Sequence, residues 1–408
     1  MKKVWDKWTR IALVKRILVG LILGAILGIA VPQATGIAIL GDVFVSALKA
    51  IAPLLVFFLV VSSLCNAGKS HGGVIKTVII LYMFSTVLAA VIAVFASMAF
   101  PVKMTLANAA TDTSAPQGIV EVLNNLLLNV VANPVSSLVN ANYVGILMWA
   151  FLLGLAFRAA DKMTKKVLAD VADGISMVVT WIINLAPFGI FGLVFNTVST
   201  NGLDIFTTYG KLLLLLVGCM LFIYFVTNPL LVYWCIRQNP YPLIFHCLKR
   251  SALTAFFTRS SAANIPVNMK VCEEMGLDRD TYSVTIPLGA TINMDGAAIT
   301  ITVMTMATAF TLGIHVDIPT AIILSLLAAL SACGASGVAG GSLLLIPMAC
   351  SLFGISDDIS MQVVAVGFII GVVQDSVETA LNSSSDLLLS ASAEFRQWRL
   401  EGKEIKFK

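Results

Sequence analysis

The sequence predicts an all-α membrane protein with eight transmembrane helices and two opposed re-entrant helical hairpins, arranged as an inverted repeat. Of its 408 residues, 58% are hydrophobic and only 12% are charged, whereas about 25% of residues are charged in soluble domains. Apolar runs of about 20 residues, long enough to cross a bilayer, recur along the chain. In the C-terminal half, one interrupted pattern of Gly, Ser and Ala occurs twice.

The apolar runs account for the predicted crossings. They begin near Ile11, Ile39, Val74, Gly118, Gly174, Tyr209, Val284 and Ile359. The first run lacks a small-residue cleavage site, so we expect a retained helix and no cleaved signal peptide.

The basic residues predict the orientation. Most Lys and Arg lie in the N-terminal tail, in segments 157–166, 237–250 and 270–279, and in the C-terminal tail. The positive-inside rule then places both termini in the cytoplasm, with Lys103 and Lys211 outside. We expect a multi-pass protein of a bacterial inner membrane. The net charge of +4 does not indicate a nucleic-acid partner, because the basic residues follow short loops rather than one face with interleaved aromatics.

Cysteine and histidine spacing gives no metal, disulfide or enzyme signature. The seven cysteines include no CxxC pair, and His71, His246 and His315 are far apart in the chain. An intramembrane hydrolase would need a serine in a nucleophile turn with an accessible base, and no GxSxG occurs. We expect no catalytic residues.

The repeated pattern predicts the two hairpins. SALTAFFTRSSAANIPVNM at 251–269 and LSACGASGVAGGSLLLIPMA at 330–349 each have two short apolar arms around a polar tip. Backbone groups at such tips cannot face lipid, so the tips must line a cavity. Flanking charges place the first hairpin's ends inside and the second's outside, as in transporters that bind solutes between broken helices near the bilayer midplane.

Polar residues at membrane depth mark the expected site. A single one is equally compatible with helix packing. Six are harder to explain in that way, because a charged group at depth costs at least about 2.5 kcal/mol on insertion scales. Their oxygens suit a hard, non-redox cation such as sodium. The six are Asn293, Asp295, Asp375, Glu378, Asn382 and Asp386.

Four motifs carry a resemblance to a known family. They are TRSSAANIP at 258–266, GATINMDG at 289–296, SGVAGG at 336–341 and DSVETALNSSSD at 375–386. Over essentially its whole length the chain resembles the dicarboxylate/amino acid:cation symporter family, which has the glutamate-transporter fold. Within that family it looks like the bacterial sodium-coupled serine/threonine symporters.

The resemblance implies three sodium sites. The first would comprise Gly289, Asn293, Asn382 and Asp386; the second Tyr82, Ser85, Thr86, Asn293 and Asp295; the third backbone oxygens near Thr291 and residues 332–335. It also implies substrate contacts. Asp375 would bind the α-ammonium and the Asn382 amide the α-carboxylate, with help from the backbone of Ser260 and Ser261 at the first tip and Gly337 at the second. Independently of the resemblance, the place of Thr379 beside Glu378 indicates that it accepts a bond from a substrate hydroxyl.

Departures from the family pattern predict the substrate class. Members that carry acidic substrates have an arginine where this chain has Glu378, and a threonine where it has Ala297. Both anion-binding groups are lost, so we expect small neutral amino acids, with both serine and threonine carried. Arg259 at the first tip could pair with Glu378 or with Asp375, and a purely structural ion pair is an equal alternative. Ala339 replaces the usual proline of the second hairpin.

The resemblance also implies how the chain is organised. Residues 1–240 would form helices 1–6, with helices 1, 2, 4 and 5 as a trimerising scaffold and helices 3 and 6 joining the transport region. Residues 241–395 would form the core transport region, which slides against the scaffold in elevator-type exchange, and 396–408 a cytoplasmic tail. The alternatives are a sodium- or proton-coupled symporter of acidic amino acids or dicarboxylates, and an ion channel.

Overall fold

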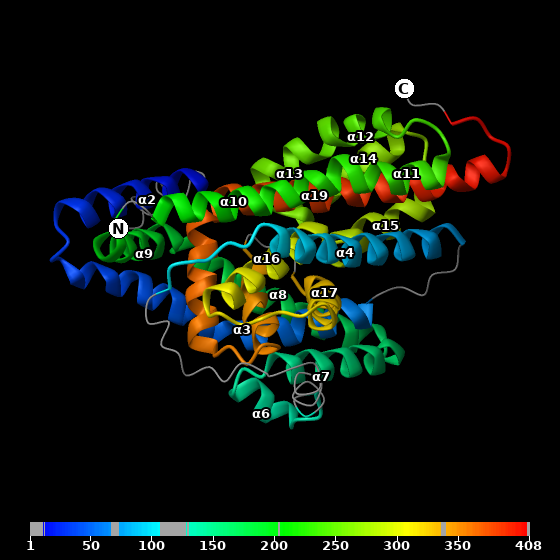
Figure 1. The fold of residues 1–408 in the computed structure, drawn as a ribbon. Coiled ribbons are helices and arrows are strands. Elements are labelled where there is room, and N and C mark those ends of the chain that lie inside the picture. The colour runs from blue at the N-terminus through cyan, green and yellow to red at the C-terminus, as the bar shows by residue number, and fades with distance from the viewer. Residues whose placement is uncertain are drawn as a thin grey trace.

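The computed structural model describes residues 11, 13–66, 73–106, 128, 130–202, 205–335 and 340–405, and every regular element in this part of the chain is a helix (Figure 1). The all-α prediction is confirmed. The helices of the first half are α2 (Leu13–Ala30), α3 (Ala38–Asn66), α4 (Gly73–Ala99), α6 (Pro134–Val139), α7 (Tyr143–Ala156), α8 (Lys162–Asn184), α9 (Ala186–Asn201), α10 (Ile205–Phe222) and α11 (Asn228–Ile236), with short 3₁₀ turns η1 (Thr35–Ile37) and η2 (Phe157–Ala159) and a π turn η3 (Ile223–Thr227).

Six helical segments of the described residues are long and apolar enough to cross a membrane. They are Thr35–Asn66, Gly73–Ala99, Lys162–Asn184, Phe206–Ile236, Arg279–Thr311 and Asp357–Leu400. The run predicted from Gly118 falls largely on residues 107–127, outside the described part. The count of eight crossings therefore stays a prediction.

The run predicted from Gly174 was wrong in its bounds. Gly174 lies inside α8, which ends at Asn184, and a new helix, α9, begins at Ala186. Pro187 stands in the first turn of α9, where its missing N–H costs no helical hydrogen bond and its fixed φ favours a helix start. The apolar stretch across this point belongs to two helices.

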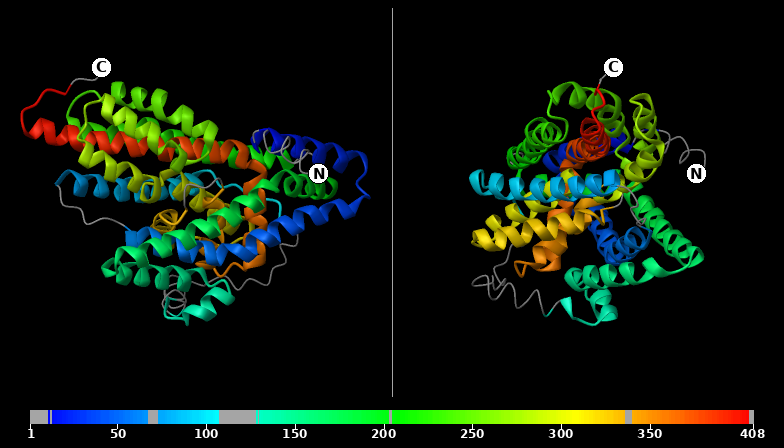
Figure 2. Two further views of the ribbon diagram at one scale, coloured as in Figure 1. Left: turned by 180° about the vertical axis from the view of Figure 1, so that it is seen from behind. Right: turned by 90° about the vertical axis from the view of Figure 1, so that its right-hand side faces the viewer.

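Glycines allow α2 to pack directly against α9. Gly20, Gly24 and Gly28 recur every four residues and so share one face of α2. A Cβ on Gly24 would lie 2.6 Å from the Phe191 carbonyl oxygen, and one on Gly28 2.9 Å from that of Phe195. This α2–α9 pair forms one end of the molecule, and the C-terminal part of α19 lies toward the other (Figures 1 and 2).

The segment predicted as the first hairpin forms two helical arms. One arm runs through α12 (Tyr241–Cys247), the π turn η4 (Leu248–Ala252) and α13 (Leu253–Thr258), and the other is α14 (Ser261–Glu274). The chain reverses at Arg259, whose φ of 53° ends α13, and at Ser260, whose hydroxyl accepts a bond from Ala263 N and so caps α14. The predicted tip and the observed turn coincide.

The second hairpin also has two arms. These are α17 (Ile318–Ala332) and η5 (Ser342–Leu345) continued by α18 (Ile346–Ser351). Its predicted tip, including Gly337 and Ala339, falls on 336–339, which lie outside the described residues.

Two long segments lie between and after the hairpins. The helix with ATINMDGAA is broken as predicted: α15 (Arg279–Ile292) stops before Asn293 and α16 (Asp295–Thr311) starts after Met294. By contrast, α19 (Asp357–Leu400) is one helix of 44 residues and passes without interruption through the expected boundary at 396. It contacts both hairpins, α4 and α16, and therefore forms the centre of the site described next.

Candidate binding site at the broken helix

The break between α15 and α16 brings three elements into contact. Asn293 is fully buried and donates from Nδ2 to Asp386 Oδ1 on α19 at 2.9 Å. Tyr82 of α4 donates its hydroxyl to the Asp386 backbone oxygen at 2.8 Å. Any Cβ on Gly289 would lie 2.8 Å from the Asp386 carboxylate and 2.9 Å from the Tyr82 hydroxyl. Glycine at 289 therefore lets α15 approach this carboxylate closely.

An unpaired oxygen lies at the same point. Asn293 Oδ1 is buried and has no hydrogen-bond partner among the described residues, which in an apolar interior is unfavourable by about 1–3 kcal/mol. A monovalent cation bound by this oxygen and the Asp386 carboxylate would satisfy both. The donor set of carboxylate, amide and hydroxyl oxygens is the kind that sodium accepts.

A second carboxylate lies on the other side of the break. Asp295, the first residue of α16, accepts hydrogen bonds from Ser85 at 2.8 Å and Thr86 at 3.3 Å, both on α4. Thr86 also accepts a bond from Met294 N at 3.2 Å. Three of the five side chains of the predicted second sodium set thus contact one another directly, while those of Tyr82 and Asn293 contact Asp386 instead.

Asp375 on α19 connects the two hairpins. Its Oδ2 accepts from Arg259 Nε at 2.6 Å, and its Oδ1 accepts from the backbone N–H of Gly340 at 3.1 Å. Of the two partners that the sequence left open for Arg259, the structure pairs it with Asp375. The Arg259 Nη1 atom is buried without a partner, so the guanidinium keeps an unused donor beside the expected substrate position.

Glu378 anchors a separate cluster. Its Oε2 accepts hydrogen bonds from Gln374 at 2.5 Å, Thr300 at 2.7 Å and Ser342 at 2.9 Å. These donors come from α19, α16 and the second hairpin, so one carboxylate joins three elements. Sequence reasoning missed all three donors; only Gln374, one turn before Glu378 on the same helix, left a spacing signal.

The other residues predicted to bind substrate use some of their hydrogen-bonding groups for bonds within the protein. Asn382 Oδ1 accepts from Gly296 N at 2.7 Å, and its Nδ2 faces the Met294 sulfur at 3.4 Å. The hydroxyl of Thr379 donates to the carbonyl of Asp375 one turn earlier, at 2.7 Å, which leaves its lone pairs free to accept. Ser261 is buried beside the first tip.

The third predicted sodium set is only partly brought together. Thr291 donates its hydroxyl to Leu288 within α15 at 2.7 Å, while Cys333 Sγ lies 3.7 Å from the Ile292 carbonyl oxygen. The start of the second tip therefore contacts the end of α15.

An amide and hydroxyl network, also missed from the sequence, fixes the first hairpin to α19. Asn264 donates to Ser383 Oγ at 2.8 Å, and Asn268 to the Ser383 carbonyl at 2.8 Å. Ser251 on the opposite arm donates to Asn268 at 2.5 Å. The two arms are thus bonded to each other and to α19 through buried polar groups, which hold the first tip beside Asp375.

Comparison with known proteins decides the family. The family model described as the sodium:dicarboxylate symporter family matches residues 13–394, which contain the whole site. The chain belongs to this family. Among its relatives, a protein of Bifidobacterium adolescentis named serine/threonine transporter SstT is 57% identical over 406 residues, covering 99% of this chain and 94% of the relative. A Streptococcus thermophilus protein with the same name is 55% identical over 400 residues, covering 98% and 100%.

Membership in the sodium:dicarboxylate symporter family makes the chain a multi-pass membrane protein of a transporter family. The resemblance inferred from the four sequence motifs is confirmed, and the helices of membrane-spanning length agree with it.

Proposed function

We propose that this protein imports serine and threonine by symport with sodium ions. The observation that carries the proposal is identity of 55–57% over nearly the full length to relatives named serine/threonine transporter. The orphaned amide oxygen of Asn293, beside the carboxylate of Asp386, supports sodium as the coupled ion.

Sodium would bind on both sides of the helix break. One ion would use Gly289, Asn293, Asn382 and Asp386, and a second Tyr82, Ser85, Thr86, Asn293 and Asp295. A third would use oxygens near Thr291 and the second hairpin. One sodium moving inward across about 100 mV releases roughly 2.3 kcal/mol, and a tenfold gradient about 1.4 kcal/mol more. One ion is therefore enough to concentrate a neutral amino acid several hundredfold.

The amino acid would bind between the hairpin tips. Its α-ammonium would take the place of Arg259 on the Asp375 carboxylate, and its α-carboxylate would meet the Asn382 amide, backbone at Ser260, Ser261 and Gly337, and the guanidinium that Asp375 releases. Arg259 thus neutralises Asp375 while the site is empty. The side-chain hydroxyl would donate to Thr379 or to Glu378, both on α19.

Glu378 supports a neutral rather than an acidic substrate. Three donors fix its Oε2 near Asp375, so an acidic side chain would meet a second carboxylate with no arginine in reach on α19. Separating threonine from serine by one methyl group yields only about 1–3 kcal/mol of discrimination, so we expect both to be carried.

The remaining organisation is also proposed. The hairpins, α15, α16 and α19, with α4 and α10, would move as one body against a scaffold that includes the α2–α9 pair and α3, in a trimer with eight crossings per chain. Both termini would lie in the cytoplasm of a bacterium, with the protein in the inner membrane.

Radiolabelled serine uptake into proteoliposomes tests the proposal. We expect uptake to require an inward sodium gradient, to be blocked by excess threonine and not by aspartate, and to be lost in Asp386→Asn. Asp173→Asn, an exposed carboxylate on α8, is the matched control and should transport normally. Uptake without sodium, or strong inhibition by aspartate, would instead favour a different coupling ion or an acidic substrate.

A further inference from the structure

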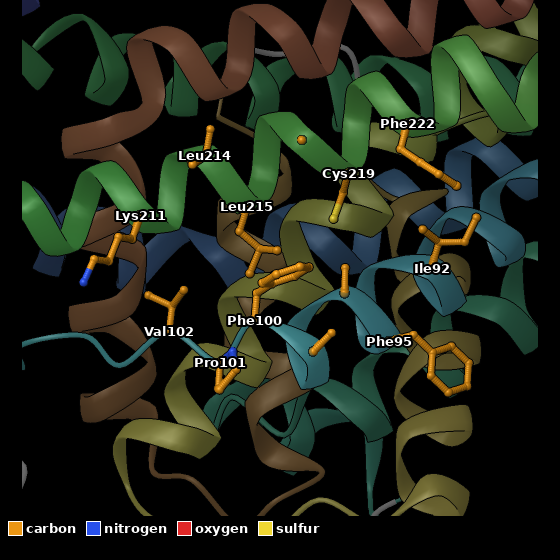
Figure 3. A pocket seen from close by; sticks show the side chains of 13 residues that line it. Ile92, Phe95, Phe100, Pro101, Val102, Lys211, Leu214, Leu215, Cys219 and Phe222 are labelled. Carbon is orange, nitrogen blue, oxygen red and sulfur yellow. The ribbon is translucent and has the colours of Figure 1, made fainter.

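An apolar groove lies between α4 and α10, and α4 also supplies Tyr82, Ser85 and Thr86 to the site. Its volume is about 840 Å³, and Lys211 is the one charged residue that lines it. Figure 3 shows the lining side chains, with Lys211 at one end beside Val102 and Phe222 at the other beside Ile92.

The groove forms because a small residue on each helix, Gly218 on α10 and Ala96 on α4, faces the neighbouring helix among larger side chains. On α10, Lys211, Leu214, Gly218 and Phe222 recur at intervals of three or four residues and so share one face. Gly218 recesses this face, since no atom lies within 4 Å of a Cβ built on it. On α4 the small Ala96 faces the groove in the same way. Larger side chains form its walls.

The dimensions match one leaflet of a bilayer. Lys211 and Phe222 are separated by about 16 Å along α10, about half of the roughly 30 Å hydrocarbon thickness. The groove is therefore long enough to hold the part of an acyl chain that lies in one leaflet.

The positive charge of Lys211 at one end of the groove indicates a ligand with a negatively charged headgroup. Lys211 is exposed, and the ion pairs of the described residues do not include it. It lies two turns into α10, at the groove end where α4 has just finished at Ala99. Lys211 lies more than one turn inside the apolar segment Phe206–Ile236, a depth from which a lysine can extend its ammonium group toward a phosphate at the membrane surface.

We propose that this groove binds a single anionic phospholipid, with acyl chain between α4 and α10 and phosphate beside Lys211. The lipid would lie along the helix that supplies Tyr82, Ser85 and Thr86, beside a part of α4 that follows those residues in the chain.

Photo-crosslinking of the full-length protein tests the site. Delipidated protein in detergent is mixed with phosphatidylglycerol that carries a photoreactive diazirine in its acyl chain, and adducts are mapped by mass spectrometry. We expect adducts on peptides of α4 and α10. Unlabelled phosphatidylglycerol should compete up to about fivefold better than the zwitterionic phosphatidylcholine, the limit for one exposed ion pair.

Two variants separate the acyl-chain and headgroup contributions. Gly218→Leu fills the groove and should abolish the adducts, while Lys211→Gln should keep them and remove the preference for phosphatidylglycerol. The matched controls are Gly210→Leu, a glycine of α10 that also has open space at its Cβ but does not line the groove, and Lys103→Gln, a neighbouring lysine outside the lining. Both should behave as the unmodified protein.

Three results would overturn the proposal. They are adducts that persist in Gly218→Leu, a phosphatidylglycerol preference that survives Lys211→Gln, and no adduct on α4 or α10 in the unmodified protein. The last result would mean that a second copy of the chain covers the groove.

Discussion

Two interfaces of this molecule are built in opposite ways. In the α2–α9 pair, glycines bring two backbones together, and Gly24 leaves no room for even a methyl group. Around the broken helix, α4, α16 and α19 are joined by side-chain hydrogen bonds to Asp295, Asp386 and Glu378. Backbone packing has no alternative partner, whereas a polar bond can be exchanged for a bond to an ion or a solute. The first interface suits a fixed support and the second a site that loads and empties.

The largest effect should come from removing a charge at the polar interface. Asp295→Asn keeps the shape that Ser85 and Thr86 contact but removes the negative charge that would face a cation. We expect the sodium concentration for half-maximal serine uptake to rise by at least about 100-fold, within the range for a buried, hydrogen-bonded charge of about 3–5 kcal/mol. Asp280→Asn, an exposed carboxylate in the first turn of α15, is the control. An unchanged sodium dependence would remove Asp295 from the ion site.

A methyl group at the glycine-packed interface should destabilise the protein. Gly24→Ala would place a Cβ 2.6 Å from the Phe191 carbonyl oxygen, and overpacking of this kind costs about 1–3 kcal/mol. We expect a lower midpoint of thermal unfolding in detergent.

Gly174→Ala is the matched control for this change. Gly174 also lies inside a helix but has open space at its Cβ, so alanine should be neutral or stabilising there because of its higher helix propensity. Equal shifts in the two variants would mean that the α2–α9 contact is looser than the backbone positions indicate.

Glu378 should control which side chains the polar interface admits. Glu378→Gln removes the negative charge but keeps an oxygen for Thr300 and Ser342, so aspartate should become about tenfold more effective as an inhibitor of serine uptake. Serine transport itself should change less. Glu273→Gln, exposed on the first hairpin, should leave aspartate without effect, and the same result in Glu378→Gln would show that position 378 does not set the charge preference.

The smallest effect should come from the ion pairs between α3, a helix of the proposed scaffold, and α19, which carries the polar site. Lys49 of α3 lies 3.1 Å from Asp357 and 2.7 Å from Asp358 at the start of α19. These groups are substantially exposed, and such pairs contribute at most about 1 kcal/mol. Lys49→Gln should therefore change the maximal uptake rate less than about fivefold, and Lys76→Gln, an exposed lysine on α4, should not change it. A larger effect would identify Lys49 as a contact that limits the proposed movement of α19 relative to α3.

Local features of this fold were predictable from the sequence. Asn293 and Met294 interrupt a helical pattern between a glycine-containing arm and an Asp-Gly pair, so the break needed no tertiary information. The first tip was equally local, because Ser260 supplies a helix cap directly after Arg259. Pro187 carried a signal for the start of α9, but the apolar run across it outweighed that signal in the prediction.

Contacts between distant elements were not predictable in the same way. Ser85 and Asp295 are 210 residues apart, and neither helix shows from its own pattern which face meets the other. The same holds for Thr300 and Ser342, whose hydroxyls are ordinary for buried helices until Glu378 is placed between them. The partner of Arg259 depended on how the tip is placed along α19, which only the assembled structure gives.

The continuity of α19 has a consequence for the alignment of its polar side chains. Asp375, Glu378, Asn382 and Asp386 occur at intervals of three and four residues on one uninterrupted helix, so they form a single row about 16 Å long. Their mutual register is set by covalent geometry. One inserted residue between Asp375 and Asp386 would turn one end of the row by about 100° relative to the other, so the amino-acid and ion contacts proposed for the two ends would no longer share one face of the helix.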